Sequence, residues 1–215
     1  MNREELIAKT LLDIKAVFLS PKQPFTWASG IKSPIYCDNR LVNSFPKART
    51  IVENALVDLI KEKYPDANCI VGTSTAGISH AAIIAHIMNL PMAYVRHKVK
   101  DHGRAKYVEG QIPSGAKVVV IEDLMSTGKS SIEVVEILRR ENVNVLGIAS
   151  IFTYNLELCS SNLKQNNITN FSLSNFNVLS NLALKNNIID NQDYENLLKF
   201  QQNPKDESWI KTKSV

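Results

Sequence analysis

Two adjacent carboxylates, Glu122 and Asp123, directly follow an apolar run of four β-branched residues at 118–121. Small and hydroxylated residues come next at 126–130, and a helical pattern begins near Ser130. This order predicts a buried strand that carries the acid pair to its carboxyl end, followed by a loop and a helix N-terminus. Backbone N–H groups point outward at such a junction, so it can bind a phosphate group.

The acid pair cannot bind the same phosphate, because like charges repel. Glu122 and Asp123 must therefore face hydroxyl groups or a cation, and a ligand that combines a phosphate, a diol and Mg²⁺ is a sugar phosphate. In one alternative, the two acids only cap the following helix and the hydroxylated residues form a turn. A second alternative is a Walker A nucleotide loop, suggested by Gly128-Lys129-Ser130, but that motif needs a glycine where Asp123 stands.

Two other segments could contact a ligand. The segment 96–106 carries as much net positive charge as the whole chain, formally +4. This concentration favours a compact anionic ligand over a long basic face, although such clusters are most often solvated surface. Gly103 lies within this loop and Gly110 follows it, so the loop is expected to close over the strand ends. The small residues at 73–77 follow a predicted strand, where they fit a ligand loop or an ordinary connection equally well.

The elements that must position these residues alternate between short apolar strands and helices. Strands are predicted at 69–71, 92–95, 117–121 and 145–152, and helices at 46–62, 78–88 and 130–141. Such alternation predicts an α/β fold with a mostly parallel sheet flanked by helices, in which ligands bind at the carboxyl ends of the strands. Helical spacing predicts an amphipathic helix over 3–18, and extended pieces are expected around a turn at Gly30. After Asn155 asparagine is frequent, yet apolar residues persist, so this part is expected to be folded.

Composition excludes several classes of protein. The 215 residues are 44% hydrophobic and 21% charged, as in an ordinary soluble chain. The longest apolar run, 81–85, is far shorter than the ~20 residues of a membrane span, and acids at 4 and 5 stand where a secretory signal needs basic residues. The three cysteines lack the spacing of a disulfide framework or a zinc site, so a reducing cytoplasm is expected. His80 and His86 suit hydrogen-bonded helix histidines better than metal ligands.

The segment from Glu122 to Ser130 resembles the phosphoribosyl diphosphate (PRPP) binding motif of the type I phosphoribosyltransferases. Two further segments are similar to the orotate phosphoribosyltransferases within that family. The pattern F-x-x-x-S-G-x-x-S-P of their N-terminal segment is present at 25–34. Their mobile-loop pattern matches Arg96, Lys100, His102 and Gly103.

This resemblance implies a role for each site residue. Glu122 and Asp123 are expected on the ribose hydroxyls of Mg-PRPP, and Lys100 is expected to be catalytic with them. The 5-phosphate is expected to lie against Leu124, Met125, Ser126, Thr127, Gly128, Lys129 and Ser130. The diphosphate is expected to contact Arg96, Lys100 and His102, and also the loop of Thr73, Ser74, Thr75, Ala76 and Gly77. Orotate is expected to contact Ser126 and Lys32, while Mg²⁺ is carried mainly by PRPP without a dedicated set of protein ligands.

The resemblance also implies the architecture. One type I phosphoribosyltransferase-like domain is expected over 1–215, with a hood at about 1–40, a core at about 45–155 and a C-terminal part at 156–215 that completes the fold. A homodimer that shares loop residues between subunits is implied, with small-molecule substrates and neither nucleic acid nor membrane as a partner. Two positions depart from the family pattern: Lys129 stands where many members have a second glycine, and Tyr154 where some have an arginine.

The implied activity is transfer of the phosphoribosyl group from PRPP to orotate, in pyrimidine synthesis. A purine or xanthine phosphoribosyltransferase is the nearest alternative, but it is not expected to have the 100–103 segment or the 25–36 hood. The other alternative is a non-catalytic regulator that senses PRPP. Such proteins add a DNA-binding domain, for which the roughly 24 residues before Phe25 are too few.

Overall fold

The computed structural model describes residues 1–27, 30–96 and 107–210. At their centre these residues form a six-stranded sheet in the order β10-β9-β8-β5-β6-β7. Its strands are β5 (Cys69–Thr73), β6 (Met92–Val95), β7 (Val108–Gly110), β8 (Lys117–Met125), β9 (Asn144–Thr153) and β10 (Asn170–Asn175). All neighbouring pairs are parallel except β6 with β7, which confirms the predicted mostly parallel α/β fold.

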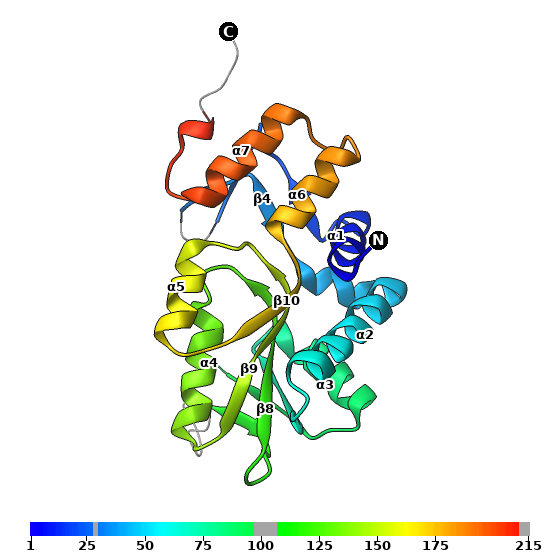
Figure 1. Ribbon diagram of the computed structural model, residues 1–215, viewed down its shortest axis with the longest axis vertical. Helices are drawn as coiled ribbons and strands as arrows, with labels where there is room; N and C mark the ends of the chain where they lie inside the picture. The colour runs from blue at the N-terminus through cyan, green and yellow to red at the C-terminus, as the bar shows by residue number, and fades with distance from the viewer. Residues whose placement is uncertain (28–29, 97–106, 211–215) are drawn as a thin grey trace.

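Helices cover both faces of this sheet (Figure 1). The described residues form α1 (Arg3–Asp13), α2 (Pro46–Lys63), α3 (Gly77–Met88), α4 (Lys129–Arg140), α5 (Glu157–Gln165), α6 (Phe176–Lys185) and α7 (Asn191–Gln202), with short 3-10 helices η1 (Asn39–Ser44) and η2 (Ser208–Ile210). In Figure 1, α4 and α5 lie on one side of the sheet and α2 and α3 on the other, while α6 and α7 lie beyond the carboxyl ends of the parallel strands. None of the helices in the described part of the chain is long and apolar enough to span a membrane.

The central strands are apolar on both faces, as parallel strands covered by helices require. Every residue of β5 is buried, and the run 118–121 of β8 has no exposed surface. The predicted end of this strand at Ile121 is wrong. β8 stays paired with β9 through the acid pair, as far as Met125 opposite Thr153. The two acids therefore lie on a strand whose hydrogen bonds to its neighbour fix their backbone.

The N-terminal segment forms a small hood of antiparallel strand pairs. These are β1 (Val17–Leu19) with β4 (Ile35–Cys37), and β2 (Phe25–Thr26) with β3 (Lys32–Ser33). The helix predicted over 3–18 is therefore wrong beyond Asp13. Apolar spacing continues past that residue, but Lys15 is left-handed, with φ 55°, and turns the chain so that β1 can pair with β4. Gly30, with φ 84°, makes the predicted turn between β2 and β3.

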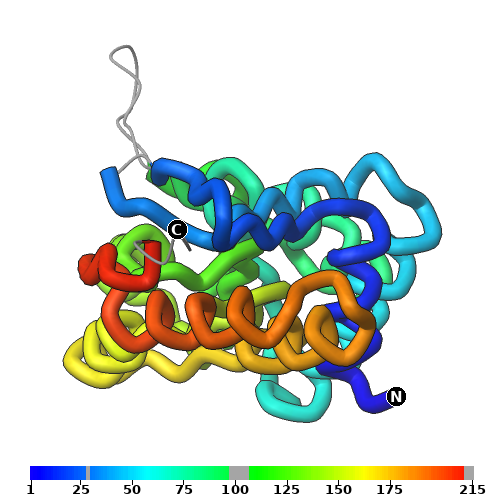
Figure 2. The backbone as a smooth tube through the Cα atoms, turned by 90° about the horizontal axis from the view of Figure 1, so that it is seen from above, coloured from blue at the N-terminus to red at the C-terminus, as the bar shows by residue number. Residues whose placement is uncertain are grey.

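The asparagine-rich C-terminal third is folded, as its persistent apolar residues predict. It contributes α5, β10, α6 and α7, and β10 joins the sheet beside β9. Asn155, Asn167 and Asn187 have positive φ, a conformation that asparagine tolerates better than most other residues with a side chain. Figure 2 views the molecule from the carboxyl end of the sheet and shows the hood, in blue, next to the C-terminal helices, in orange and red.

A chain of aromatic rings connects this C-terminal part to the hood. Trp27 stacks on Tyr154, which follows β9, with ring centroids 5.2 Å apart. Trp27 also contacts Phe200 of α7 edge-on at 5.6 Å, and Phe200 contacts Trp209 of η2 at 5.9 Å. Aromatic rings at these separations stabilise one another beyond simple burial. The C-terminal helices therefore hold the hood in place over the sheet.

Candidate active site

Glu122 is the centre of a buried hydrogen-bond network at the carboxyl edge of the sheet. Its Oε1 accepts from Thr73 Oγ1 at 3.0 Å and from the backbone N–H of Asp123 at 2.9 Å. Its Oε2 accepts from Ser131 Oγ of α4 at 2.6 Å. Both carboxylate oxygens are engaged with protein donors, and the residue is only 5% exposed. Glu122 therefore ties together the ends of β5 and β8 and the first turn of α4.

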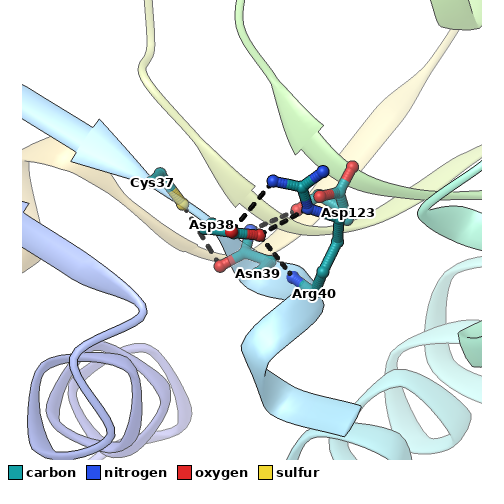
Figure 3. Close-up of polar contacts among 5 residues, drawn as sticks. All are labelled: Cys37, Asp38, Asn39, Arg40 and Asp123. Carbon is teal, nitrogen blue, oxygen red and sulfur yellow. Dashed lines mark hydrogen bonds and ion pairs between the residues drawn. The ribbon is translucent and has the colours of Figure 1, made fainter.

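Asp123, the second acid, is half-buried at the same edge. Its backbone carbonyl accepts a hydrogen bond from Asn39 Nδ2 at 2.6 Å, which attaches η1 to the end of β8 (Figure 3). Burial, together with the hydrogen bond and negative charge of Glu122, raises the pKa of Asp123 to about 7. Asp123 is thus a carboxyl group whose charge depends on what binds beside it.

The predicted phosphate loop is shorter than the sequence pattern indicates. Leu124 and Met125 still belong to β8, and α4 already begins at Lys129, so only 126–128 lie between strand and helix. Gly128 has φ 76°, and a Cβ there would meet Cys159 Sγ at 3.2 Å, so glycine is required at this turn. No side chain caps the first turn of α4, which leaves its amides available to an anion.

Lys129, the departure from the family pattern, occupies the first helical position of α4. It is exposed, and unlike Gly128 it does not have a positive φ. A side chain at this position therefore leaves the backbone of the turn unchanged.

The residues 73–77 form a second loop beside the acid pair, between β5 and α3. Thr73 points inward to Glu122, and Ser74 Oγ donates to the carbonyl of Val95 at 2.5 Å. A Cβ at Gly77 would overlap the carbonyl oxygen of Ile121. Glycine at the start of α3 therefore permits close contact with β8, and the structure brings this loop, the acid pair and the 126–130 segment to one edge.

The remaining predicted residues lie around this edge. Arg96 follows β6 and pairs with Glu109 of β7 at 3.0 Å. Lys32 is exposed on β3, where its Nζ donates to Thr26 Oγ1 at 2.7 Å. The predictions for Lys100 and His102 fall outside the described residues.

A cavity of about 580 Å³ opens beside the phosphate loop, between the hood, α5 and the end of α7. Its lining includes Trp27, Ile31, Ser126 and Thr127. Ser126, predicted to contact orotate, therefore meets the hood here. Tyr154 is only 2% exposed and lies against Trp27, so the position after β9 presents no cation to this space.

A buried polar pair connects α2 and α3, the helices on the face of the sheet opposite α4 and α5. His80 Nδ1 of α3 and Glu53 Oε1 of α2 are 2.6 Å apart, and neither side chain is more than 1% exposed. Burial raises the pKa of Glu53. For Asp123, burial raises the pKa, whereas the electrostatic interaction with His80 lowers it. The prediction of a hydrogen-bonded helix histidine is confirmed for His80, while His86 is exposed.

Sequence reasoning missed the residues that follow β4. Asp38 accepts from Arg40 Nε at 2.6 Å and from Nη2 at 2.9 Å, and Arg40 interacts electrostatically with Asp123. Figure 3 shows this group beside the end of β8. A usable signal was present, because Asp38-Asn39-Arg40 is a polar run directly after an extended segment, like the acid pair after its own strand.

Comparisons with known proteins agree with this geometry. The model of the phosphoribosyl transferase domain family matches residues 43–169. An orotate phosphoribosyltransferase of Bacillus anthracis is 50% identical over 204 residues, which cover 95% of this chain and 97% of that protein. One of Listeria innocua is 48% identical over 211 residues, covering 98% and 100%.

Among solved structures, orotate phosphoribosyltransferase from Aeropyrum pernix superposes with a TM-score of 0.74 at 25% identity, over 86% of this chain and 99% of that one. The sequence matches extend over nearly the whole chain, so they include the hood and the asparagine-rich C-terminal third as well as the acid pair. The chain therefore belongs to the orotate phosphoribosyltransferase family of type I phosphoribosyltransferases.

Proposed function

We infer that this chain transfers the 5-phosphoribosyl group of PRPP to orotate, giving orotidine 5'-monophosphate and diphosphate in pyrimidine biosynthesis. The observation that carries this inference is identity of 50% with a curated orotate phosphoribosyltransferase over 95% of the chain. The convergence of the acid pair and two small-residue loops at one sheet edge supports it. The reaction makes the chain a pentosyltransferase.

In this proposal each loop meets one part of PRPP. Both acids are predicted to accept from the ribose hydroxyls. In this proposal Asp123 keeps that role, while the role of Glu122 is revised: its oxygens already accept from Thr73, Ser131 and the Asp123 N–H, so it holds the strand ends in position. The amides of the 126–130 segment bind the 5-phosphate. The 73–77 loop, with Arg96, Lys100 and His102, binds the diphosphate, and Ser126 and Lys32 contact orotate.

The C1–O bond to diphosphate breaks as positive charge develops on the ribose ring. Asp123, acting through the hydroxyls, stabilises that charge, and basic side chains stabilise the departing anion. In this proposal the residues between β6 and β7 that carry Lys100 and His102 close over the strand ends and exclude the water that would otherwise attack the ring.

Mg²⁺ suits this edge because a half-buried carboxylate and phosphate oxygens are the ligands it prefers. Within the described residues, no group of three or more His, Cys, Asp or Glu side chains is placed to hold a metal ion. The proposal therefore has the ion arrive with PRPP, and Asp123 is the carboxylate that would face it. When bound, it offsets the negative charge of the diphosphate.

The activity is tested by following orotate absorbance with PRPP and Mg²⁺, beside hypoxanthine, xanthine and uracil as other acceptors. We expect orotate alone to be consumed and EDTA to stop the reaction. If another base reacts while orotate is left unchanged, the acceptor assignment is wrong. A rate that survives EDTA after exhaustive dialysis contradicts the metal-bound donor.

PRPP binding to the free protein is expected to strengthen as the pH rises through about 7. Asp123 has a pKa raised to about 7, so it is mostly protonated below that pH, and only the carboxylate accepts from both ribose hydroxyls. Titration calorimetry with Mg-PRPP is expected to give about tenfold weaker binding at pH 6 than at pH 8. Because PRPP itself titrates, Asp123→Asn is the control: a profile that is equally steep in this variant contradicts the assignment to Asp123.

The proposal also includes a homodimer in which Lys100 acts on the partner's active site. The ten residues 97–106 join Arg96 and Tyr107, whose backbones are hydrogen-bonded at 2.9 Å. At ~3.3 Å per residue, a segment fixed at both ends can reach roughly 15 Å from the sheet, and in this proposal it reaches the partner's site across a close interface. Lys100→Ala and Asp123→Asn homodimers are each expected to be inactive. Co-expressed in equal amounts, the two variants are expected to recover about a quarter of wild-type activity, because half of the randomly paired dimers carry one complete site of two. Mixed dimers that are isolated by tag pull-down and remain as inactive as their parents rule out sharing of Lys100.

We further propose that one domain spans 1–215 and that it works in the cytoplasm. The cysteine pattern supports a reducing compartment. The continuous sheet, which runs from β7 to β10, supports one domain. In this proposal the chain's partners are PRPP, orotate and a second copy of itself, with neither nucleic acid nor a membrane among them.

A further inference from the structure

The acceptor in the proposed reaction is a planar base that carries a carboxylate, and a cationic side chain of the site is the natural partner for that group. A guanidinium group is the side chain that best matches a carboxylate, because its N–H groups form two parallel hydrogen bonds to the two oxygens. Tyr154 is buried against Trp27 and brings no charge. Lys32 of β3, already proposed to contact orotate, offers a single point charge and donates to Thr26 Oγ1, so it cannot form the paired hydrogen bonds of a guanidinium.

Arg40 lies beside Asp123, the acid assigned to the ribose hydroxyls. The base becomes attached to C1 of the ribose, next to the hydroxyls assigned to Asp123. The diphosphate loop and Arg96 belong to β5 and β6, on one side of β8 in the sheet. Arg40 instead comes from the hood side, directly after β4, and its neighbour Asn39 is bonded to the backbone of Asp123 at 2.6 Å.

The Arg40 side chain is held ready for a second carboxylate. Asp38 occupies one edge of the guanidinium, with Nε at 2.6 Å and Nη2 at 2.9 Å, and it also accepts from the backbone N–H of Arg40 at 3.3 Å. Among the described residues, no acceptor is recorded for the other edge of the guanidinium, formed by Nη1 and the second hydrogen of Nη2, so that edge can bind another carboxylate. In Figure 3 the guanidinium lies at the Asp123 end of this group, and the two residues interact electrostatically.

We propose that Arg40 binds the carboxylate of the acceptor base and so selects orotate over uncharged pyrimidines, and that Asp38 is the positioning residue for its guanidinium. This inference rests on the proposed function. The Arg40 guanidinium is mostly exposed, with 64% of the side chain accessible. Its replacement therefore leaves the core intact, and loss of function in a variant does not reflect unfolding.

The test compares two nucleotides that differ only in the carboxylate. Orotidine 5'-monophosphate and uridine 5'-monophosphate are titrated calorimetrically into wild-type protein, Arg40→Gln, Arg40→Lys and Asp38→Asn. Arg140→Gln, at the far end of α4, is the matched control. We expect Arg40→Gln to weaken binding of the carboxylated nucleotide about 10- to 100-fold and to leave uridine monophosphate within about twofold. Arg40→Lys is expected to weaken this binding to an intermediate degree, because lysine keeps the positive charge but cannot form two parallel hydrogen bonds to the carboxylate.

Kinetics supply the second readout. In Arg40→Gln the KM for orotate is expected to rise about 10- to 100-fold while the KM for PRPP stays within about twofold. Asp38→Asn is expected to produce a smaller change of the same kind. The inference is overturned if Arg40→Gln keeps the wild-type preference for the carboxylated nucleotide. It is also overturned if this variant loses affinity for both nucleotides equally. Failure of the proposed function is seen separately, because wild-type protein would then consume no orotate.

Discussion

Asp123→Asn is expected to remove nearly all activity and, above neutral pH, to make the protein more stable. Burial next to Glu122 raises the pKa of Asp123 from 3.8 to about 7. A carboxyl group whose pKa is raised by folding stabilises the fold fully only when the pH is below its pKa in the unfolded chain. That contribution is lost as the pH rises through its folded-state pKa of about 7. The ionised carboxylate then destabilises the free protein by up to about 4 kcal/mol, which an uncharged amide of the same shape avoids.

The measurement is urea denaturation of both proteins at pH 6 and pH 8.5, together with turnover. We expect the stability advantage of Asp123→Asn to grow between the two pH values, while kcat falls by about 10³-fold because the amide cannot stabilise the ribose cation. Asp58→Asn, an exposed change on α2, is the matched control and should alter neither quantity. Equal stability differences at both pH values would falsify the assignment of this destabilisation to the ionised Asp123 carboxylate. Normal turnover would show that Asp123 has no part in the reaction.

His80→Ala is expected to lower the free energy of unfolding by about 3 to 5 kcal/mol, because it leaves the carboxyl group of Glu53 buried without its partner. Glu53→Gln is the milder comparison, since an amide oxygen can still accept from His80 Nδ1. Urea denaturation near pH 7 measures both. A loss below about 1 kcal/mol in His80→Ala means that the interior reorganises around the missing ring.

The same variant has a second expected effect on the active site. His80 lowers the pKa of Asp123 by electrostatic interaction, so its removal should raise that pKa. The midpoint of the pH dependence of PRPP binding is then expected to move upward in His80→Ala. An unchanged midpoint, with the stability loss still present, assigns the Glu53–His80 pair a purely structural role.

Local sequence patterns predicted the bounds of an element correctly where those bounds depend only on residues within and next to that element. The strand β6 was predicted residue for residue, because its apolar run is short and bounded at both ends. The helix predicted over 3–18 was too long, since pairing of β1 with a strand about 18 residues further along outweighs the helical spacing. For the same reason β8 continues past Ile121: its partner β9 supplies hydrogen bonds that no local pattern reveals.

In the candidate site, too, local features could be predicted from the sequence, whereas contacts between distant segments could not. The acid pair and the two small-residue loops could be found from sequence, because each follows an apolar strand directly. The contacts that join them could not. Thr73 and Glu122 are 49 residues apart in sequence, and Asn39 reaches the backbone of Asp123 across 84 residues. Nothing in the order of residues indicates that Glu122 faces the protein while Asp123 remains half-buried.

The aromatic chain gives this protein an optical property. The sequence contains two tryptophans, Trp27 in the hood and Trp209 near the C-terminus, and both pack against Phe200. Trp27 also stacks on Tyr154 and lines the cavity beside the phosphate loop. A ligand that shifts the hood therefore changes the surroundings of one emitting indole directly and of the other through a single shared ring. The native fluorescence spectrum is therefore expected to report on the hood and on the cavity that Trp27 lines, without any introduced label.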